Sequence, residues 1–271
     1  MIDRFQTLRA TFAAVALAGS LSAAAATQVL YDPAATSTDP AQAGWLAGSL
    51  LFVNATYGVA GVTLSPQLGN SSLAGYSNYS SSLVTDPGAP KVNTAFPVLG
   101  SANGYRLGFG MDLDAESHTG NVNRAGFSVT LIGHDLRGVE IGFQNDRIFA
   151  QSLSGNSFVA AENTTNASFV AAAFAANRWD LTVTGNTYAL TLGNQTVLSG
   201  NTRDYSAYTG NGQNAYRTPD FVFFGDNTSS AQATFTFSYA AITTPVPEPG
   251  QGALLAAGIG VLALLGRRRR D

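Results

Sequence analysis

The chain has 271 residues, of which 45% are hydrophobic and only 11% charged, and its formal net charge is −3. The sequence contains no cysteine, which excludes a disulfide scaffold, a cysteine-ligated zinc site, an iron–sulfur cluster and a catalytic thiol. Two histidines, His118 and His134, leave little room for histidine-based metal or triad chemistry, and the acidic balance with Lys91 as the single lysine argues against a nucleic-acid partner.

The N-terminal segment has the order of a secretory signal peptide. Two arginines precede a run of small and apolar residues over 10–21, and three alanines follow. Ala24 and Ala26 fit the −3 and −1 positions of a cleavage site. We therefore predict that residues 1–26 form a signal helix that is cleaved during export.

The next 217 residues, 27–243, alternate apolar and polar side chains over short stretches separated by turn residues. This alternation is the pattern of half-buried strands. The clearest stretch runs over 105–113, and the same pattern recurs over 127–131 and 139–143. It predicts one all-β domain of about ten to twelve strands, without an internal repeat.

Glycine–asparagine pairs divide residues 178–200 into further strands. Apolar residues alternate on both sides of Gly185-Asn186, and Gly193-Asn194 comes directly after the second stretch. Such pairs suit the positive φ of tight hairpin turns. Residues 219–226 are apolar enough to predict a fully buried strand.

The last predicted strand places Phe235, Phe237 and Tyr239 on one face. Residues 167–176 are the only ambiguous candidate for a helix inside the domain. Residues 65–104 are rich in Ser, Asn, Gly and Pro, which predicts long surface loops between weak edge strands.

Three segments of this domain occur in an order that resembles a concanavalin-like jelly roll. They are 138–152, 178–200 and 219–239, and the last contains a strand, a Gly-Asp-x-Thr-Ser loop and a closing aromatic strand. Bacterial surface proteins of the lectin and laminin-G sort, and choice-of-anchor domains, show this order. The resemblance implies an antiparallel β-sandwich of the jelly-roll, concanavalin-like lectin type.

Carboxylates are the first candidates for chemistry. Asp112, Asp114 and Glu116 are spaced two apart, so in a strand they would share one face. They could bind Ca²⁺, flank a glycosidic bond, or form a solvated polar face. Asp226 lies in the loop after a predicted strand, where it could bind Ca²⁺ or hydrogen-bond its own backbone. Calcium is the only cofactor that these residues suggest.

Hydrolase motifs are missing from the sequence. Jelly-roll glucanases carry Glu-x-Asp-x-x-Glu, but the segment starting at Glu140 has Gly142 and Asn145 at the other two positions. No nucleophile elbow, phosphate-binding loop or paired-histidine motif is present. We predict no catalytic residues and a non-catalytic binding or structural module. The alternative is a carbohydrate-active hydrolase that uses carboxylates on the jelly-roll face.

Tyrosines are the second set of candidates, because aromatic rings on a concave sheet stack against sugars. Six of them fall in or near predicted loops: Tyr76, Tyr79, Tyr105, Tyr205, Tyr208 and Tyr216. The core of a sandwich needs aromatic residues as well. A glycan, in particular an extracellular polysaccharide, is therefore the ligand that we expect.

The C-terminal tail has three blocks in order. A linker over 244–252 contains Val246, Pro247, Glu248 and Pro249. An apolar run over 253–266 follows, and its 14 residues would form a helix of about 21 Å, shorter than the ~30 Å core of a bilayer. The final block, 267–271, holds Arg267, Arg268, Arg269 and Arg270. Arginines of this kind stay on the cytoplasmic side of the inner membrane.

This tail resembles the PEP-CTERM sorting signal of Gram-negative bacteria. The resemblance rests on the Pro-Glu-Pro motif, the apolar run and the arginine cluster, together with the predicted signal peptide. It implies that an exosortase, a membrane-embedded cysteine protease, recognises the tail. The protein would cross the inner membrane, be held there transiently by a short transmembrane helix, and then reach the cell surface or extracellular matrix.

Overall fold

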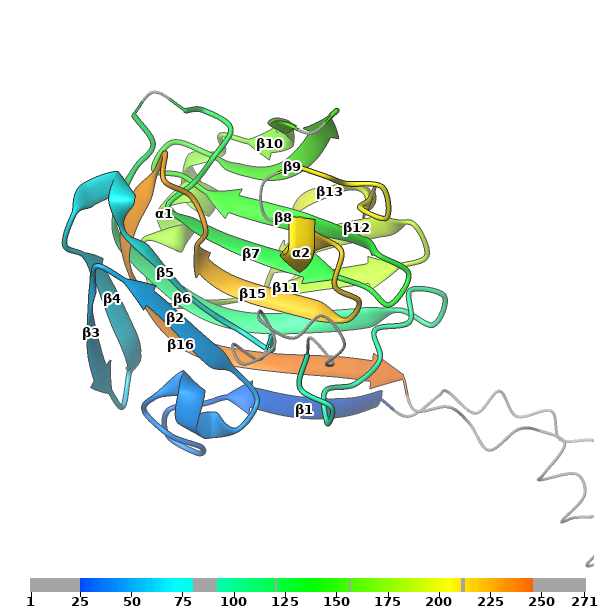
Figure 1. The fold of residues 1–271 in the computed structure, drawn as a ribbon, viewed down its shortest axis with the longest axis horizontal. Coiled ribbons are helices and arrows are strands. Elements are labelled where there is room, and N and C mark those ends of the chain that lie inside the picture. Colours follow the sequence, from blue (N-terminus) through cyan, green and yellow to red (C-terminus); the bar gives the residue numbers. More distant parts are fainter. Residues whose placement is uncertain (1–24, 80–91, 120, 156, 211–212, 246–271) are drawn as a thin grey trace, which may run out of the picture. The chain divides into compact units, whose positions relative to one another are not determined.

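The computed structural model describes residues 25–79, 92–119, 121–155, 157–210 and 213–245. These residues fall within one compact unit, Ala25–Val246. They form an antiparallel β-sandwich of two eight-stranded sheets (Figure 1). Residues 1–24 of the predicted signal helix, the motif over 246–249, the predicted transmembrane helix and the arginine cluster lie outside the described residues. Ala25 and Ala26, the last two residues of the predicted signal segment, are described and lie in a strand. None of the helices in the described part of the chain has the length and apolarity needed to span a bilayer.

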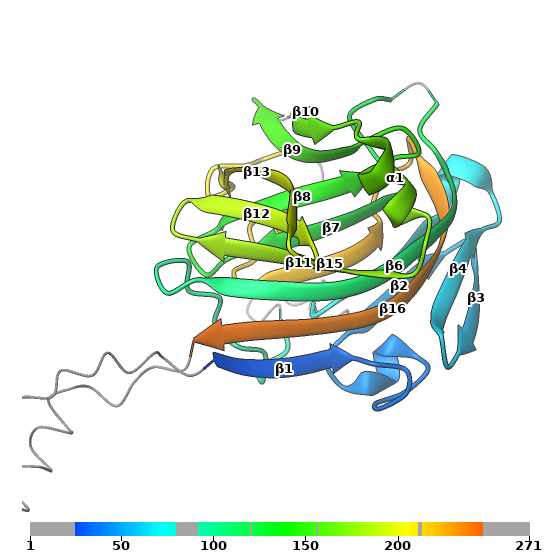
Figure 2. The same cartoon turned by 180° about the vertical axis from the view of Figure 1, so that it is seen from behind.

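The first sheet is built around its two longest strands, which pair with each other. In spatial order it contains β13 (Gln195–Asn201), β12 (Thr187–Leu192), β11 (Asn177–Thr184), β6 (Tyr105–Ser117), β16 (Gln232–Pro245), β4 (Gly61–Pro66) and β3 (Val53–Gly58). β1 (Ala25–Tyr31) pairs with the C-terminal half of β16, and the two strands run side by side in Figures 1 and 2. The sandwich therefore extends two residues beyond the predicted boundary at each end.

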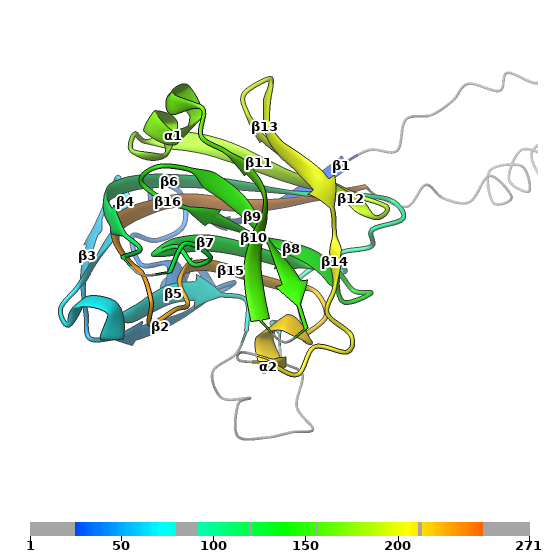
Figure 3. The same ribbon diagram turned by 90° about the horizontal axis from the view of Figure 1, so that it is seen from above.

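The second sheet packs against the first as a separate layer (Figure 3). Its strands are β10 (Ser157–Thr164), β9 (Ile148–Ser154), β8 (Arg137–Phe143), β7 (Phe127–Ile132), β15 (Phe221–Asp226), β5 (Leu73–Ser77) and β2 (Ala47–Leu51). The short β14 (Arg203–Asp204) pairs with β8. The helical elements are α1 (Ala167–Ala173), α2 (Gln213–Tyr216) and two 3-10 turns, Pro40–Ala43 and Gly69–Ser71.

Aromatic pairs join the two sheets across the core. Phe127 lies 4.8 Å from Phe235, and Phe143 lies 5.3 Å from Trp179, measured between ring centroids. Each pair has one ring from each sheet, and all four side chains are buried. Burial of large rings is the main stabilising term of such a core.

Several predictions of local structure are confirmed. The hairpin of β11 and β12 turns at Gly185, which has φ of 56°. The strand predicted over 219–226 is β15, and the ambiguous segment 167–176 contains helix α1, capped by the Asn166 side chain.

The described sheets contain sixteen strands, more than the ten to twelve predicted. Two predictions of local structure are also wrong. Tyr239 does not share a face with Phe237, because the register of β16 against β6 shifts between these two residues. The ring of Tyr239 lies instead on the outside, with the Arg178 guanidinium 3.8 Å from its centroid. Residues 65–104 are also more than loops, because they contain β5, whose Tyr76 is buried between neighbours on both sides.

Candidate functional site

The second sheet is covered on its outer face as well as on its inner face. Along β15, Val222 and Phe224 belong to the main core, whereas Phe221 belongs to a second apolar cluster. Alternate side chains of a strand point to opposite faces, so this second cluster lies outside the sandwich. Ile132 of β7 joins it in the same way.

The chain between β13 and β15 crosses this outer face and supplies three tyrosines. Tyr205 stacks on Tyr216 with ring centroids 5.1 Å apart, and Tyr208 meets Tyr216 edge-on at 5.4 Å. Phe158 of β10 lies 5.0 Å from Tyr216. All three tyrosines are buried, so their rings anchor this crossing segment to the outer face of the sheet.

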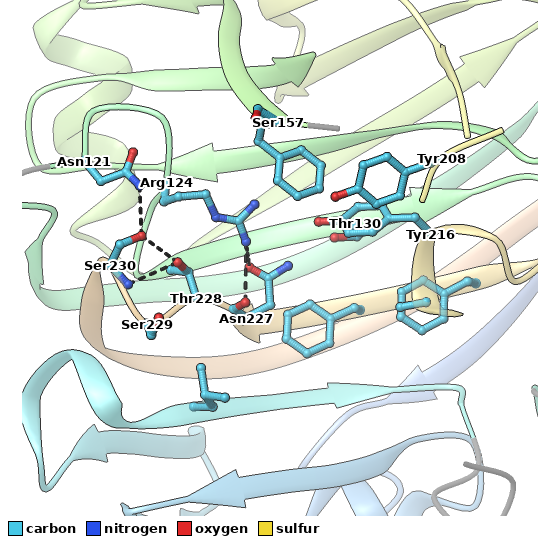
Figure 4. A pocket seen from close by; sticks show the side chains of 15 residues that line it. Asn121, Arg124, Thr130, Ser157, Tyr208, Tyr216, Asn227, Thr228, Ser229 and Ser230 are labelled. Carbon is cyan, nitrogen blue, oxygen red and sulfur yellow. Dashed lines mark hydrogen bonds between the residues drawn. The ribbon is translucent and has the colours of Figure 1, made fainter. Parts of the chain in front are cut away.

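A pocket of about 660 Å³ opens beside the tyrosines (Figure 4). Its apolar lining comes from Leu73, Phe158, Tyr208, Ala215, Tyr216, Phe221 and Phe223. Its polar lining comes from Asn121, Arg124, Thr130, Ser157, Asn227, Thr228, Ser229 and Ser230. A volume of this size, with an apolar lining and a few polar groups, is typical of small-molecule sites.

Arg124 is the only charged residue among the described residues that line the pocket, and it is 9% exposed. Its guanidinium lies 4.8 Å from the Phe158 ring centroid and donates to Gln151 Oε1 at 3.1 Å. It also donates to the side-chain oxygen of Asn227. The cation is therefore held on several sides and its position is fixed.

Glu140 is the counter-charge of Arg124 and is completely buried behind the pocket. Its Oε1 lies 3.6 Å from Arg124 Nη1 and accepts a hydrogen bond of 3.4 Å from Asn227 Nδ2. Its Oε2 accepts a hydrogen bond from the Tyr216 hydroxyl. One carboxylate thus anchors three of the side chains that line the pocket.

The Tyr216 hydroxyl is a stable donor in this network. Burial and the negative charge of Glu140 hold the pKa of Tyr216 well above its usual value. The hydroxyl therefore stays protonated over the whole physiological range.

The polar rim is a chain of short hydrogen bonds in the loop between β15 and β16. Asn121 Nδ2 donates to Ser230 Oγ at 3.0 Å, and Thr228 Oγ1 lies 2.8 Å from Ser230 Oγ. Thr130 Oγ1, on the pocket floor, is buried and has no hydrogen-bond partner among the described residues. Hydroxyl and amide groups are thus placed opposite the aromatic wall (Figure 4).

Phe223 extends the apolar floor over a glycine. A Cβ atom added to Gly75 of β5 would lie 2.2 Å from the Phe223 ring. The ring can occupy this position only because residue 75 has no side chain. The glycine therefore shapes the pocket without lining it.

Two of the six candidate tyrosines, Tyr208 and Tyr216, line the pocket. Tyr205 supports them from behind, and Tyr79 packs against the same cluster, edge-on to Phe221 at 6.1 Å. Tyr76 and Tyr105 are buried in the main core, so the expectation that they face a ligand is wrong.

The carboxylates of β6 do not share one face. The register against β16 shifts between Thr234 and Phe235, so Asp112 and Asp114 face outward while Glu116 is buried. Glu116 accepts hydrogen bonds from Asn145 N at 2.9 Å and from Gly126 N at 3.4 Å. Its role is to fix two turns.

Asp226 is buried at the end of β15. Of the two roles considered for it, binding Ca²⁺ or hydrogen-bonding its own backbone, the structure shows the hydrogen bond. Its Oδ1 accepts a hydrogen bond of 3.0 Å from Thr228 N. Burial raises the pKa of Asp226 to about 8, against the opposing effects of this hydrogen bond and of Arg124. In the parts of the chain that the structure describes, no three His, Asp or Glu side chains gather closely enough to hold a metal ion, so the calcium prediction gains no support from geometry.

No motif marks the Arg124–Glu140 network in the sequence. Glu140 stands at the start of an absent glucanase motif, and Arg124 stands in a polar loop. The one usable signal is Glu140 itself, whose neighbours over 138–143 are all apolar or glycine. A lone charge in such a strand requires a buried partner.

The C-terminal residues decide how the protein is sorted. Residues 245–270 match the family model for the PEP-CTERM protein-sorting motif. The tail is a PEP-CTERM sorting motif. This confirms the prediction made from Pro247, Glu248, Pro249 and the arginine cluster. Proteins with this PEP-CTERM motif are exported, processed by exosortase and sorted to the cell surface.

The PEP-CTERM motif covers only the tail. No curated protein sequence matches the chain. Among solved structures, the chain is similar to a carbohydrate esterase from the Shiga toxin-encoding bacteriophage phi24B, with 9% identity and a TM-score of 0.48 over 82% of this chain and 100% of that one.

Two further β-sandwich structures resemble the body. The carbohydrate-binding module CBM66 from Bacillus subtilis has 9% identity and a TM-score of 0.37 over 71% of this chain and 92% of that one. Sheep galectin-11 in complex with glycerol has 9% identity and a TM-score of 0.31 over 52% of this chain and 89% of that one. These scores describe a general likeness of fold, and no activity is transferred from them.

Proposed function

We propose that this PEP-CTERM protein is a non-catalytic glycan-binding module of the cell surface or extracellular matrix, and that its ligand occupies the pocket on the outer face of the second sheet. The observation that carries the proposal is the opposition of an aromatic wall to a rim of fixed hydroxyl and amide groups. A sugar ring has the same two kinds of surface, C–H groups on its faces and hydroxyls on its edge.

The charges of the pocket support a neutral or weakly polar ligand. Arg124 is compensated by Glu140, which lies 3.6 Å away. The remaining polar groups of the rim, such as Asn121 and Ser230, are uncharged. Free hydroxyl groups would find partners in the rim, including the unpartnered Thr130 Oγ1. A strongly anionic ligand would meet no uncompensated cation in the pocket.

The positions of the carboxylates favour binding over hydrolysis. Hydrolysis of a glycosidic bond uses a pair of carboxyl groups on either side of the scissile bond. Among the residues that the structure describes, none that lines the pocket carries a carboxylate. Asp112 and Asp114 lie on the outer face of the other sheet, so neither carboxylate reaches this pocket.

The binding proposal is tested by titrating the protein with soluble polysaccharides and their oligosaccharides in a calorimeter. Removing one ring, by Phe158→Ala or Phe223→Ala, is expected to weaken binding about tenfold, because a stacked ring contributes on the order of 1.4 kcal/mol. Tyr239→Ala, which removes a ring from the opposite sheet, is the control and should bind as the parent does.

Two outcomes contradict the proposal. Equal binding by the parent and both pocket variants would show that the pocket is not the site. Release of reducing ends from a polysaccharide, lost on Asp114→Asn, would show a hydrolase instead. Repeating the titration with Ca²⁺ and with a chelator determines whether the ligand needs a cation.

The route to the surface has a separate test. Replacing Pro247, Glu248 and Pro249 by alanine in a host that contains an exosortase should leave a longer form held in the inner membrane. Immunoblots of membrane and extracellular fractions measure this directly. Unchanged mass and unchanged release in the variant would refute transient anchoring through the tail.

A further inference from the structure

The two sheets end side by side in strands that no other described strand covers. β2 is the last strand of the second sheet and β3 the last strand of the first. Only Phe52 separates them in the chain. Both strands appear at the same side of the sandwich in Figure 1. Each therefore presents a free row of backbone N–H and C=O groups at this side.

These edges lack the usual protection against pairing. Proteins guard free edges with charges, prolines or bulges. Residues 40–79 contain no charged side chain, and β2 pairs with β5 in a continuous register without a bulge. Nothing in the described edge opposes the approach of another strand.

Apolar side chains are held outward at the corner between the two edges. Leu50, Leu51 and Phe52 are 40%, 45% and 48% exposed. Phe52 has φ of 55°, a left-handed conformation that is strained for a bulky residue. Its carbonyl oxygen accepts hydrogen bonds from Ser72 Oγ at 2.7 Å and Gln67 N at 2.8 Å. The corner is thus locked in a conformation that keeps these side chains in solvent.

We propose that β2 pairs with β2 of a second copy of this chain, in antiparallel fashion about a twofold axis. A free strand edge forms a ladder of backbone hydrogen bonds with another strand, and a lipid surface has no backbone groups with which to form such a ladder. Residues 27–246 contain 14 acidic and 8 basic residues, so two copies carry net charge of the same sign and repel each other. The uncharged edge is where that repulsion is weakest, and self-pairing of identical strands closes into a dimer.

Cysteine scanning tests the pairing directly, because the chain has no cysteine of its own. Single cysteines are placed at Ser49, Leu50 and Leu51 of the full-length chain and oxidised with diamide. Facing Cα atoms of paired strands are about 4.5–5.5 Å apart, within the range of a disulfide. At least one position is expected to give a covalent dimer on a non-reducing gel.

Thr196→Cys is the matched control, since Thr196 is exposed on β13 at the far edge of the first sheet. It should remain monomeric. Ser49→Lys places a charge on the β2 edge and is expected to convert a dimer to a monomer in sedimentation velocity, whereas Thr196→Lys should not. Both lysine variants keep the fold if their melting temperatures match that of the parent.

The proposal is overturned if none of the three β2 cysteines forms more dimer than Thr196→Cys. It is also overturned if the parent is monomeric up to about 100 μM and Ser49→Lys instead abolishes binding to phosphatidylethanolamine–phosphatidylglycerol vesicles. That second result would assign the apolar corner to a membrane surface. Neither result depends on whether the pocket binds a glycan.

Discussion

We expect the stability of this protein to depend on pH through Asp226, and replacement of Asp226 by asparagine to remove that contribution. The carboxyl group is 5% exposed, and burial raises its pKa to about 8 from the model-peptide value of 3.8. The nearby negative charge of Glu116 acts in the same direction. Between these two pH values the folded protein retains a proton that the unfolded chain has already released.

The sign and size of the effect follow from this difference in protonation. Stability falls as pH rises wherever the folded state binds more protons than the unfolded state. The slope is at most about 1.4 kcal/mol per pH unit, and over about four units the loss reaches at most ~6 kcal/mol. The contribution of Asp226 is thus fully present below pH 4 and is lost as pH rises towards 8.

Asp226→Asn keeps the shape and an acceptor oxygen for Thr228 N, but it cannot ionise. The variant is expected to match the parent near pH 4 and to be more stable by several kcal/mol at pH 8. Urea unfolding at pH 4, 5, 6, 7 and 8 measures this, with the fluorescence of the buried Trp179 as the reporter. Asp114→Asn, at an exposed position, controls for the loss of one charge.

A difference between Asp226→Asn and the parent that stays constant from pH 4 to pH 8 would refute the reasoning. So would a variant that is less stable than the parent at every pH. The first result would mean that Asp226 ionises alike in the folded and unfolded states. The second would mean that the hydrogen bond to Thr228 N needs a carboxyl group.

Two further predictions concern the pocket. Glu140→Gln leaves Arg124 buried without its counter-charge and is expected to lower the free energy of unfolding, measured by urea titration, by about 3–5 kcal/mol. Adding Arg124→Met to this variant should recover most of the lost stability. A double variant less stable than Glu140→Gln alone would contradict the ion pair. Gly75→Ala drives a methyl group into the Phe223 ring and should cost about 1–3 kcal/mol and weaken glycan binding. Gly100→Ala, where an added Cβ meets nothing within 4 Å, is its control in thermal unfolding.

The fold was predictable because its signal is local and repeated. Alternation over 105–113 and the glycine–asparagine turn at Gly185 each involve neighbours in the chain, and both fix which side chains face the core. The sorting motif was predictable for the same reason, since its three blocks follow one another. The prediction of an antiparallel sandwich did not require knowing which distant strands pair.

The errors occur where a bulge changes the phase of a strand. A shift beside Phe237 moves Tyr239 outward, and a shift opposite Phe235 moves Glu116 inward. A bulge adds one residue to one strand of a pair. Its position depends on the partner strand, so the alternation of apolar and polar residues in the sequence does not reveal it. The prediction that Asp112, Asp114 and Glu116 share a face failed for this reason.

The pocket was only half predictable, because its residues come from separate elements. Arg124 comes from a loop, Glu140 from β8, Phe158 from β10 and Tyr216 from α2. Each of these residues has an ordinary neighbourhood in the sequence. Their meeting depends on the order of strands in the second sheet, together with the segment that crosses its outer face.

The pocket and the free β2 edge belong to the same sheet, and this gives the dimer a consequence for binding. Leu73, which lines the pocket, pairs directly with Leu51 of β2. The twofold axis of an antiparallel strand pair is perpendicular to the sheet, so both pockets of a β2-paired dimer would open on the same side.

One long polysaccharide could then occupy both pockets, and two linked sites bind at least about tenfold more tightly than one. Ser49→Lys should therefore weaken binding to a long polysaccharide by that factor while binding of a short oligosaccharide is unchanged. Equal loss for both ligands would mean that the substitution damages the pocket, and no loss for either would mean that the two pockets act independently.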